Sequence, residues 1–396
     1  MKPAAGSSTL DIQLPVPGGR LEPFRLSEPR AFPARPTHRF NRVAYAAAHV
    51  VADPLSDADP WLDCALDWEA TLSFRRYLWS LGLGVAEAMD TAQRGAGMSW
   101  EASLELIQRS VAAARDIPGA LLAAGAGTDQ LEPRAGLTLE KVVSAYEEQF
   151  EAIEAAGGRI VMMSSRALAA CAAGPDDYYR VYSRLLRQAR DPVILHWLGD
   201  MFDPALAGYW GHLDPRAAMD VCLAVIREHA HRIDGVKISL LDKQLEIHMR
   251  RRLPAGVRMY TGDDFNYAEL IEGDELGHSH ALLGIFDAIA PVASEALNAL
   301  AAGERDRFRS LLAPTVPLAR HLFKSPTRFY KTGVVFLAWL NGHQNHFTLV
   351  GGQQSARSLL HFAEAFRLAD RAGVLRNPAL ACQRMRLLLA MHGVTS

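Results

Sequence analysis

The stretch Ile233-Asp234-Gly235-Val236-Lys237-Ile238-Ser239 is a short apolar run that carries a single lysine in its interior. A helical pattern over residues 217–231 precedes it, and a second strand-like run, residues 257–264, follows soon after. A lysine inside a buried strand must shift its pKa or find a partner, because desolvation of an ammonium group is costly. If the lysine loses its proton, it becomes a strong nucleophile toward carbonyl groups. The run therefore predicts a buried strand and a candidate reactive amine.

Outward from this run, short apolar segments alternate with helical patterns along most of the chain. The expected strands are residues 43–51, 84–89, 119–125, 159–163, 191–197, 233–239, 257–264 and 276–283. Eight strand–helix alternations with continuous apolar strands are typical of a parallel sheet closed into a barrel. An open doubly wound sheet usually carries a Gly-rich phosphate loop after its first strand, and this sequence has none there. We therefore predict an α/β fold, a (β/α)8 TIM barrel.

The chain divides into three expected parts. Residues 1–40 form an arm rich in Pro, Gly and Arg, with a hairpin expected around Gly18-Gly19. The arm either lies on the body, takes part in oligomer contacts or is a loosely ordered tail. Residues 41–295 form the barrel, and residues 296–396 form a helical extension that packs on the barrel or on a neighbouring subunit. Its apolar segment 334–340 is too short to cross a bilayer, which favours a buried or interface helix.

Composition excludes several classes of function. The chain has 396 residues, of which 49% are hydrophobic and 22% charged, as in an ordinary globular enzyme. A net charge of −2 provides no basic field for nucleic acid or anionic lipid. The four cysteines lie far apart without paired spacing, which is typical of reduced thiols in a cytoplasmic protein. No apolar run approaches the ~20 residues that span a bilayer, and no signal-peptide core is present.

These features predict a cytoplasmic protein with a small-molecule substrate and without a nucleic-acid or membrane partner. The apolar C-terminal helices and the proline-rich arm favour a homodimer or homotetramer over a monomer.

Polar residues at the strand ends are the candidates for chemistry, because active sites of such barrels lie at the C-terminal face. Strand alternation places Lys237 on the same face as Gly235 and Ser239, and the small glycine would leave room for the lysine side chain. The same alternation places His278 and His280 on one face. The polar residues at the expected strand ends are His49, Asp53, Glu87, Asp90, Thr91, Thr128, Asp129, Ser164, Ser165, Arg166, His196, Asp200, Lys237, Ser239, Thr261, Asp263, Asp264, His278 and His280.

Structural explanations compete with these assignments. Lys237 could pair with Asp234, Asp242 or Asp263, so a structural and a catalytic lysine are equally compatible with its position alone. Single histidines such as His196 are more often hydrogen-bonded core residues than bases or ligands.

The order of three motifs resembles the dihydrodipicolinate synthase / N-acetylneuraminate lyase (class I aldolase) superfamily, in a divergent, synthase-like branch. The motifs are residues 234–239, then Tyr260-Thr261-Gly262-Asp263-Asp264, then residues 273–280 with Ala290-Pro291 downstream. The resemblance is specific over residues 190–325 and only topological before them. It implies an eight-stranded α/β barrel in which Lys237 forms an imine with a substrate carbonyl.

The sequence departs from that family at two places. The family has a tyrosine at the end of strand five, where this chain has His196, a residue that can also transfer protons near neutral pH. The family's Gly-Thr-Thr-Gly-Glu loop after strand two is replaced by residues 89–95, in which only Thr91 corresponds. Asp90 would repel a substrate carboxylate unless Arg94 or Arg166 offsets it. The acidic, histidine-rich mouth would then suit a neutral polyol or keto sugar, or a metal.

The leading hypothesis is a Schiff-base lyase or aldolase that acts on a small carbonyl compound, a sugar-derived keto or 2-oxo substrate of carbohydrate metabolism. Lys237 is the nucleophile and His196 the proton relay, and no cofactor is required. The residues expected to orient the substrate are Asp90, Thr91, Asp264, His278 and His280.

Two alternatives remain open on the sequence. The first is a lyase, isomerase or epimerase in which a divalent metal polarises the substrate carbonyl. Its candidate ligands are Glu87, Asp90, His196, Asp264, His278 and His280. The second is a sugar-binding barrel without catalysis, against which the inward lysine argues because a buried ammonium without a role costs stability.

Overall fold

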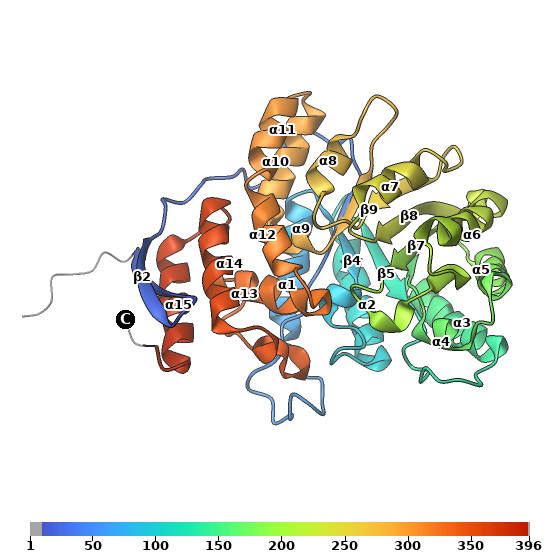
Figure 1. Ribbon diagram of the computed structural model, residues 1–396, viewed down its shortest axis with the longest axis horizontal. Coiled ribbons are helices and arrows are strands. Elements are labelled where there is room, and N and C mark those ends of the chain that lie inside the picture. Colours follow the sequence, from blue (N-terminus) through green and yellow to red (C-terminus); the bar gives the residue numbers. More distant parts are fainter. Residues whose placement is uncertain (1–9, 395–396) are drawn as a thin grey trace, which may run out of the picture.

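A closed barrel of parallel strands forms one half of the molecule, and the C-terminal helices lie beside it (Figure 1). The computed structural model describes residues 10–394, and within them eight strands close in the order β10-β3-β4-β5-β6-β7-β8-β9. The strands are β3 (Ala44–Ala47), β4 (Gly84–Glu87), β5 (Leu122–Ala126), β6 (Arg159–Met162), β7 (Val193–Leu198), β8 (Ile233–Ser239), β9 (Arg258–Thr261) and β10 (His280–Leu283). The (β/α)8 barrel predicted from the strand–helix alternation is confirmed.

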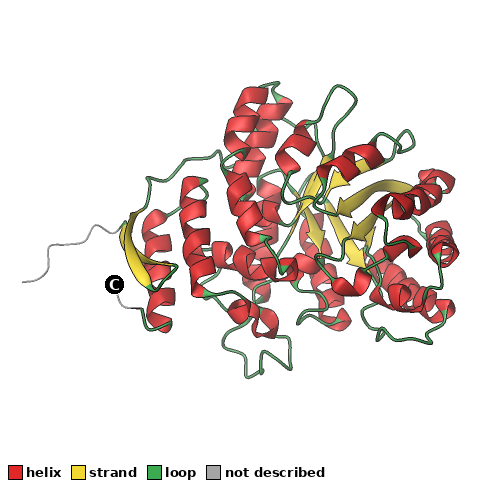
Figure 2. Ribbon diagram, viewed as in Figure 1, coloured by secondary structure: helices red, strands yellow, loops and turns green. Residues whose placement is uncertain are grey.

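Helices surround the strands on the outside, as Figure 2 shows. Asp67, Ser99 and Thr138 each precede a helix and accept a hydrogen bond from a backbone N–H of its first turn. Such N-caps satisfy amide groups that have no partner within the helix. The helices along the barrel are α1 (Trp68–Ser80), α2 (Trp100–Arg115), α3 (Leu139–Ala156), α4 (Arg166–Cys171), α5 (Pro175–Gln188), α6 (Pro215–Glu228), α7 (Lys243–Arg250) and α8 (Tyr267–Glu272).

The last barrel strand is shorter than expected. A strand was predicted over residues 276–283, but β10 begins only at His280. The preceding residues form a turn with positive φ angles of 83° at Gly273 and 144° at Gly277, a backbone that is incompatible with a continuing strand. His278 and His280 therefore lie at the N-terminal end of the barrel, opposite its mouth.

Two glycines determine which side chains fit into the barrel interior. A Cβ atom on Gly235 would lie 2.6 Å from the Tyr260 ring, so this glycine makes room for Tyr260 rather than for the lysine. A Cβ atom on Gly262 would lie 2.8 Å from Lys237 Cε. Tyr45 and Tyr260 are fully buried and fill the interior toward the N-terminal end of the barrel, which leaves Lys237 toward the C-terminal mouth.

The C-terminal helices pack against one side of the barrel. Helix α13 is completely buried, contacts α9 and the loop after β4, and contains the apolar segment 334–340 that was expected to be buried. No helix within residues 10–394 combines the length and the apolar character that a membrane crossing requires. The helices of this part are α9 (Ile285–Ala288), α10 (Ala290–Ala301), α11 (Arg305–Leu312), α12 (Thr315–Leu322), α13 (Tyr330–Leu340), α14 (Leu359–Arg371) and α15 (Pro378–Met391).

The described part of the N-terminal arm begins with a two-stranded hairpin, β1 (Asp11–Val16) and β2 (Arg20–Arg25). It lies on α14 and α15, on the far side of the C-terminal helices from the barrel (Figure 1). Ser27, just after the hairpin, binds the carboxylate of Asp370 on α14 through its backbone N–H and its hydroxyl. The hairpin expected around Gly18-Gly19 is confirmed.

Candidate active site

Lys237 points from β8 into the barrel near its C-terminal mouth. Its register partners on the neighbouring strands are His196 on β7 and Tyr260 on β9. The side chain is buried, with 7% of the residue surface exposed. It lines a small pocket of about 280 Å³, whose other polar wall residues are Asp90, Thr91, Ser239, Asp264 and Tyr330.

The amine of Lys237 makes no hydrogen bond or ion pair with any residue between 10 and 394. Desolvation lowers its pKa, and the negative charges of Asp264 and Asp90 oppose that shift. Desolvation also raises the pKa of Asp264 to about 7, although its carboxylate accepts a hydrogen bond of 2.9 Å from the Ile285 backbone N–H. Burial therefore shifts both groups toward their uncharged forms.

The structural partners considered for Lys237 are engaged elsewhere. Asp234 pairs with Arg258 and Arg159 and accepts a hydrogen bond from Tyr260 at the opposite end of the barrel. The other two carboxylates serve as caps: Asp242 binds backbone N–H groups at the start of α7, and Asp263 binds those of residues 265 and 266. Lys237 is not a strand-end lysine held in an ion pair.

His196 lies beside Lys237 on the inner side of β7. Its Nε2 is 3.3 Å from Ser239 Oγ, and its buried Nδ1 has no partner among the described residues. Desolvation, assisted by the nearby Lys237, lowers its pKa well below the ordinary value of 6.5. The imidazole is therefore neutral near pH 7.

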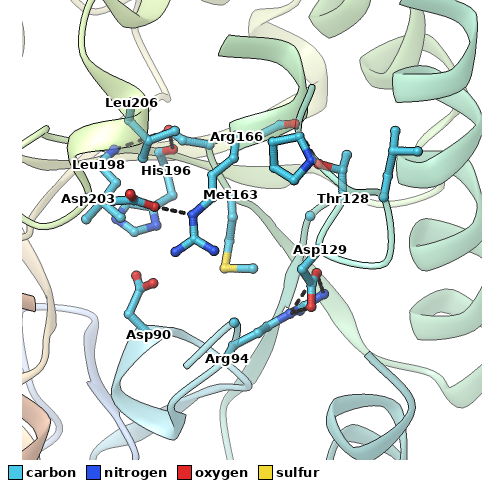
Figure 3. A pocket seen from close by; sticks show the side chains of 16 residues that line it. Asp90, Arg94, Thr128, Asp129, Met163, Arg166, His196, Leu198, Asp203 and Leu206 are labelled. Atoms are coloured by element: carbon cyan, nitrogen blue, oxygen red, sulfur yellow. Dashed lines mark hydrogen bonds and ion pairs between the residues drawn. The ribbon is translucent and has the colours of Figure 1, made fainter. Parts of the chain in front are cut away.

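His196 also lines a second, larger pocket of about 630 Å³ that adjoins the first (Figure 3). Asp90 and Leu198 line both pockets. Figure 3 shows Asp90 and Arg166 directed into this space from different sides. The carboxylate of Asp90 makes no hydrogen bond or ion pair within residues 10–394, so it is available to a ligand.

Two arginines could offset the charge of Asp90, and only Arg166 keeps donor groups that are free to bind a ligand in the pocket. Arg94 is almost completely buried and is bound to Asp129 and Gln149. Arg166 is partly exposed and binds Asp203 through Nε, which leaves its two terminal nitrogens toward the pocket.

Thr91 is held by a residue that sequence reasoning missed. Thr91 lies in the short 3-10 helix η1 (Asp90–Ala92) after β4, and its Oγ1 is 2.8 Å from Tyr330 Oη at the start of α13. Burial raises the pKa of Tyr330 well above its ordinary value, so the phenol stays protonated. No local sequence pattern marks Tyr330 as a site residue, because its position depends on the packing of α13 against η1.

The histidine pair expected at the mouth lies elsewhere, which corrects the predicted placement of both residues. His280 Nδ1 accepts a hydrogen bond of 2.9 Å from the Val43 backbone N–H at the N-terminal end of the barrel. Its ring lies 5.4 Å from that of His278. Desolvation lowers the pKa of each histidine to about 4. Neither residue shares a pocket with Lys237 or His196.

Glu87 is also outside the site. Strand alternation directs Ala86 into the barrel and Glu87 outward, where its carboxylate binds Arg75 at 2.8 Å and Ser110 at 2.6 Å under helices α1 and α2. Between residues 10 and 394 no three His, Cys, Asp or Glu side chains are grouped as metal ligands would be. The six ligands considered for a divalent ion are therefore not brought together among the described residues.

A model of the family described as "Protein of unknown function (DUF993)" matches residues 12–394. No curated protein matches the chain. Among solved structures, dihydrodipicolinate synthase from Aquifex aeolicus superposes with a TM-score of 0.59 at 13% identity, covering 89% of this chain and 98% of that one. A prophage protein of the dihydrodipicolinic acid synthase family from E. coli K12, in complex with pyruvate, gives 0.60 at 13% identity, covering 89% and 99%.

A third similar structure is the 4-hydroxy-tetrahydrodipicolinate synthase from Methylacidiphilum fumariolicum SolV. It has a TM-score of 0.57 at 14% identity, covering 76% of this chain and 87% of that one. At such identities the likeness shows a shared barrel fold, and the chemistry must be argued from this chain's own residues.

Proposed function

Since the chain belongs to the DUF993 family, whose function is unknown, we propose from the geometry of its own site that it is a Schiff-base lyase or aldolase acting on a small carbonyl compound. One observation carries the proposal: the amine of Lys237 is buried, lacks a hydrogen-bonding partner between residues 10 and 394, and faces a pocket. Its pKa is lowered by desolvation, which favours the nucleophilic form.

Imine formation uses Lys237 and Asp264. The neutral amine attacks the substrate carbonyl carbon and forms the C–N bond. The carbonyl oxygen then leaves as water, with one proton from the amine and one from the carboxyl of Asp264. A carboxyl whose pKa is about 7 is a suitable acid for this step. The products are a protonated imine on Lys237 and an adjacent carboxylate that stabilises its charge.

Bond cleavage then needs a base, and His196 lies beside Lys237 on the neighbouring strand β7. A neutral His196 can remove the proton from a hydroxyl group two carbons away from the imine carbon. The bond between the hydroxyl-bearing carbon and the carbon next to the imine carbon then breaks. Its electron pair forms an enamine on Lys237, and the hydroxyl-bearing carbon leaves as an aldehyde. In this proposal Thr91, which is held by Tyr330, and the carboxylate of Asp90 orient substrate hydroxyl groups, because both line the Lys237 pocket.

Reductive trapping tests the proposal. The protein is incubated with borohydride and a panel of carbonyl compounds that includes pyruvate and dihydroxyacetone, and peptide mass spectrometry locates the adduct. We expect the reduced adduct on Lys237 and its loss in Lys237→Ala. The matched control is Lys243→Ala, because Lys243 lies outside the barrel and pairs with Glu269. An adduct only on other lysines, or full turnover by Lys237→Ala, would overturn the imine mechanism.

A further inference from the structure

We infer that the C-terminal helical extension supplies an oxyanion subsite, formed by Lys331 and Arg328 together with Arg166, and that the substrate carries a carboxylate or phosphate group apart from its reacting carbonyl. This inference rests on the proposed function and specifies its substrate class. The subsite lies in an outer pocket of about 730 Å³, in which the three cationic side chains meet Asp90 and Asp203.

The central observation is a buried lysine amine that no carboxylate holds in an ion pair, although Asp90 and Asp203 lie near enough to act on its charge. Lys331, in the first turn of α13, is 6% exposed and forms no ion pair or hydrogen bond within residues 10–394. Its Nζ lies 5.6 Å from the centre of the Tyr330 ring, a weak interaction compared with a carboxylate partner. Burial of an unpaired charge destabilises a fold, so an arrangement of this kind fits a ligand that provides the missing anion.

Two arginines extend the positive wall. Arg166 binds Asp203 through Nε, and its terminal nitrogens remain toward the pockets (Figure 3). A Cβ atom on Gly95 would lie 2.9 Å from Arg166 Nη1, so the glycine leaves space for this guanidinium. Arg328 lies over the Phe329 ring at 5.0 Å and has no ion pair with a described residue. Guanidinium groups bind carboxylate and phosphate oxygens through two parallel hydrogen bonds.

The charges favour an anion at this place. Three cations face two carboxylates, and one of these, Asp203, is already bound to Arg166. Asp90, Phe202 and Tyr330 line both this outer pocket and the Lys237 pocket, so one ligand can occupy both. A neutral substrate was expected from a histidine-rich mouth, but the histidine pair lies at the other end of the barrel.

Anion binding to the full-length protein tests the inference without turnover. Isothermal titration calorimetry with inorganic phosphate and, separately, with acetate is expected to show binding, and the tighter of the two identifies the kind of group. Lys331→Met should weaken the preferred anion at least about tenfold, because charge-assisted hydrogen bonds are worth ~1.5–3 kcal/mol. Lys331→Arg, which keeps the charge, should retain most of the binding.

The matched control is Lys324→Met, since Lys324 is exposed and precedes the same segment outside the pocket. Unchanged anion binding in Lys331→Met, or no anion binding to the wild-type protein, would overturn the subsite. Circular dichroism confirms that each variant is folded.

Failure of the subsite and failure of the imine mechanism give different results. Lys237→Ala should still bind the anion, and Lys331→Met should still form a trapped adduct with uncharged dihydroxyacetone. Loss of trapping with intact anion binding contradicts the imine alone, and the reverse result contradicts the subsite alone.

Discussion

Thr91 Oγ1 and Tyr330 Oη lie 2.8 Å apart and connect the loop after β4 to the first turn of α13. The two residues are 239 positions apart in the chain, and both line the Lys237 pocket. The pocket is therefore completed by the C-terminal helices, so a change in those helices is transmitted directly to the proposed substrate site.

Removal of the Tyr330 hydroxyl should reduce activity as well as stability. Tyr330→Phe leaves the buried Thr91 hydroxyl without its partner, which costs about 1–3 kcal/mol of unfolding free energy. We expect turnover to fall roughly tenfold, as for the loss of one hydrogen bond of ~1.4 kcal/mol. The control is Tyr267→Phe, because Tyr267 is a buried tyrosine bound to Thr315 outside all three pockets. If both variants lost turnover equally, Tyr330 would contribute only to the stability of the fold and not to the substrate site.

Asp264 should make stability fall as the pH rises. Desolvation raises its pKa to about 7 in the folded protein, whereas an unfolded aspartate titrates near ~3.9. Between these values the folded state holds a proton that the unfolded state has lost, so the free energy of unfolding decreases with increasing pH. Asp264→Asn has no proton to lose and should gain stability relative to the wild type from pH 5 to pH 8.

Urea unfolding at several pH values measures this difference. Asp306→Asn serves as the control, since the Asp306 side chain is 98% exposed on α11 and its removal should leave the pH dependence unchanged. Parallel pH profiles for Asp264→Asn and wild type would show that the raised pKa is wrong.

Much of the fold follows from local sequence pattern. Each strand of a closed parallel barrel is buried on both sides, so its apolar run is continuous and easy to recognise. The run 233–239 coincides with β8, and the apolar segment 334–340 lies within the buried helix α13. The error at β10 arose because an apolar pattern does not show where a glycine turn ends and a strand begins.

Part of the candidate site could likewise be predicted from the sequence, and part could not. The structure brings Asp90, Thr91, His196, Lys237 and Asp264 together because each lies in the C-terminal half of a parallel strand or in the loop after one. Strand alternation alone could have removed Glu87, which follows the inward Ala86. Tyr330, Arg328 and Lys331 could not be predicted, because the docking of α13 on the barrel depends on tertiary packing that no local pattern records.

His196 should be needed for bond cleavage and not for imine formation. Its neutral imidazole faces the larger pocket and has no partner for Nδ1 within the described chain. In His196→Phe we expect kcat to fall by about 10²–10⁴, the usual contribution of a general base, while borohydride trapping at Lys237 persists. His248→Phe, at an exposed position of α7, should leave both measurements unchanged. Loss of trapping together with kcat would assign His196 to imine formation instead.

Gly262 should be required for the position of the reactive amine. A Cβ atom there would lie 2.6 Å from the Ile238 carbonyl oxygen and 2.8 Å from Lys237 Cε, and it would overlap Ser239 Oγ. The backbone on β8 cannot move without disturbing the barrel, so Gly262→Ala should cost about 1–3 kcal/mol of unfolding free energy, as overpacking of a core does. The lysine side chain is the flexible neighbour, so it would be displaced and trapping at Lys237 would slow.

The control for this substitution is Gly174→Ala, because a Cβ atom on Gly174 meets nothing within 4 Å and its backbone is extended. We expect Gly174→Ala to keep both the stability and the trapping rate of the wild type, measured by guanidinium unfolding and by the time course of adduct formation. If Gly262→Ala retained both as well, the amine would tolerate a wider range of positions than this site allows, and the close fit of Lys237 against β9 would not determine its reactivity.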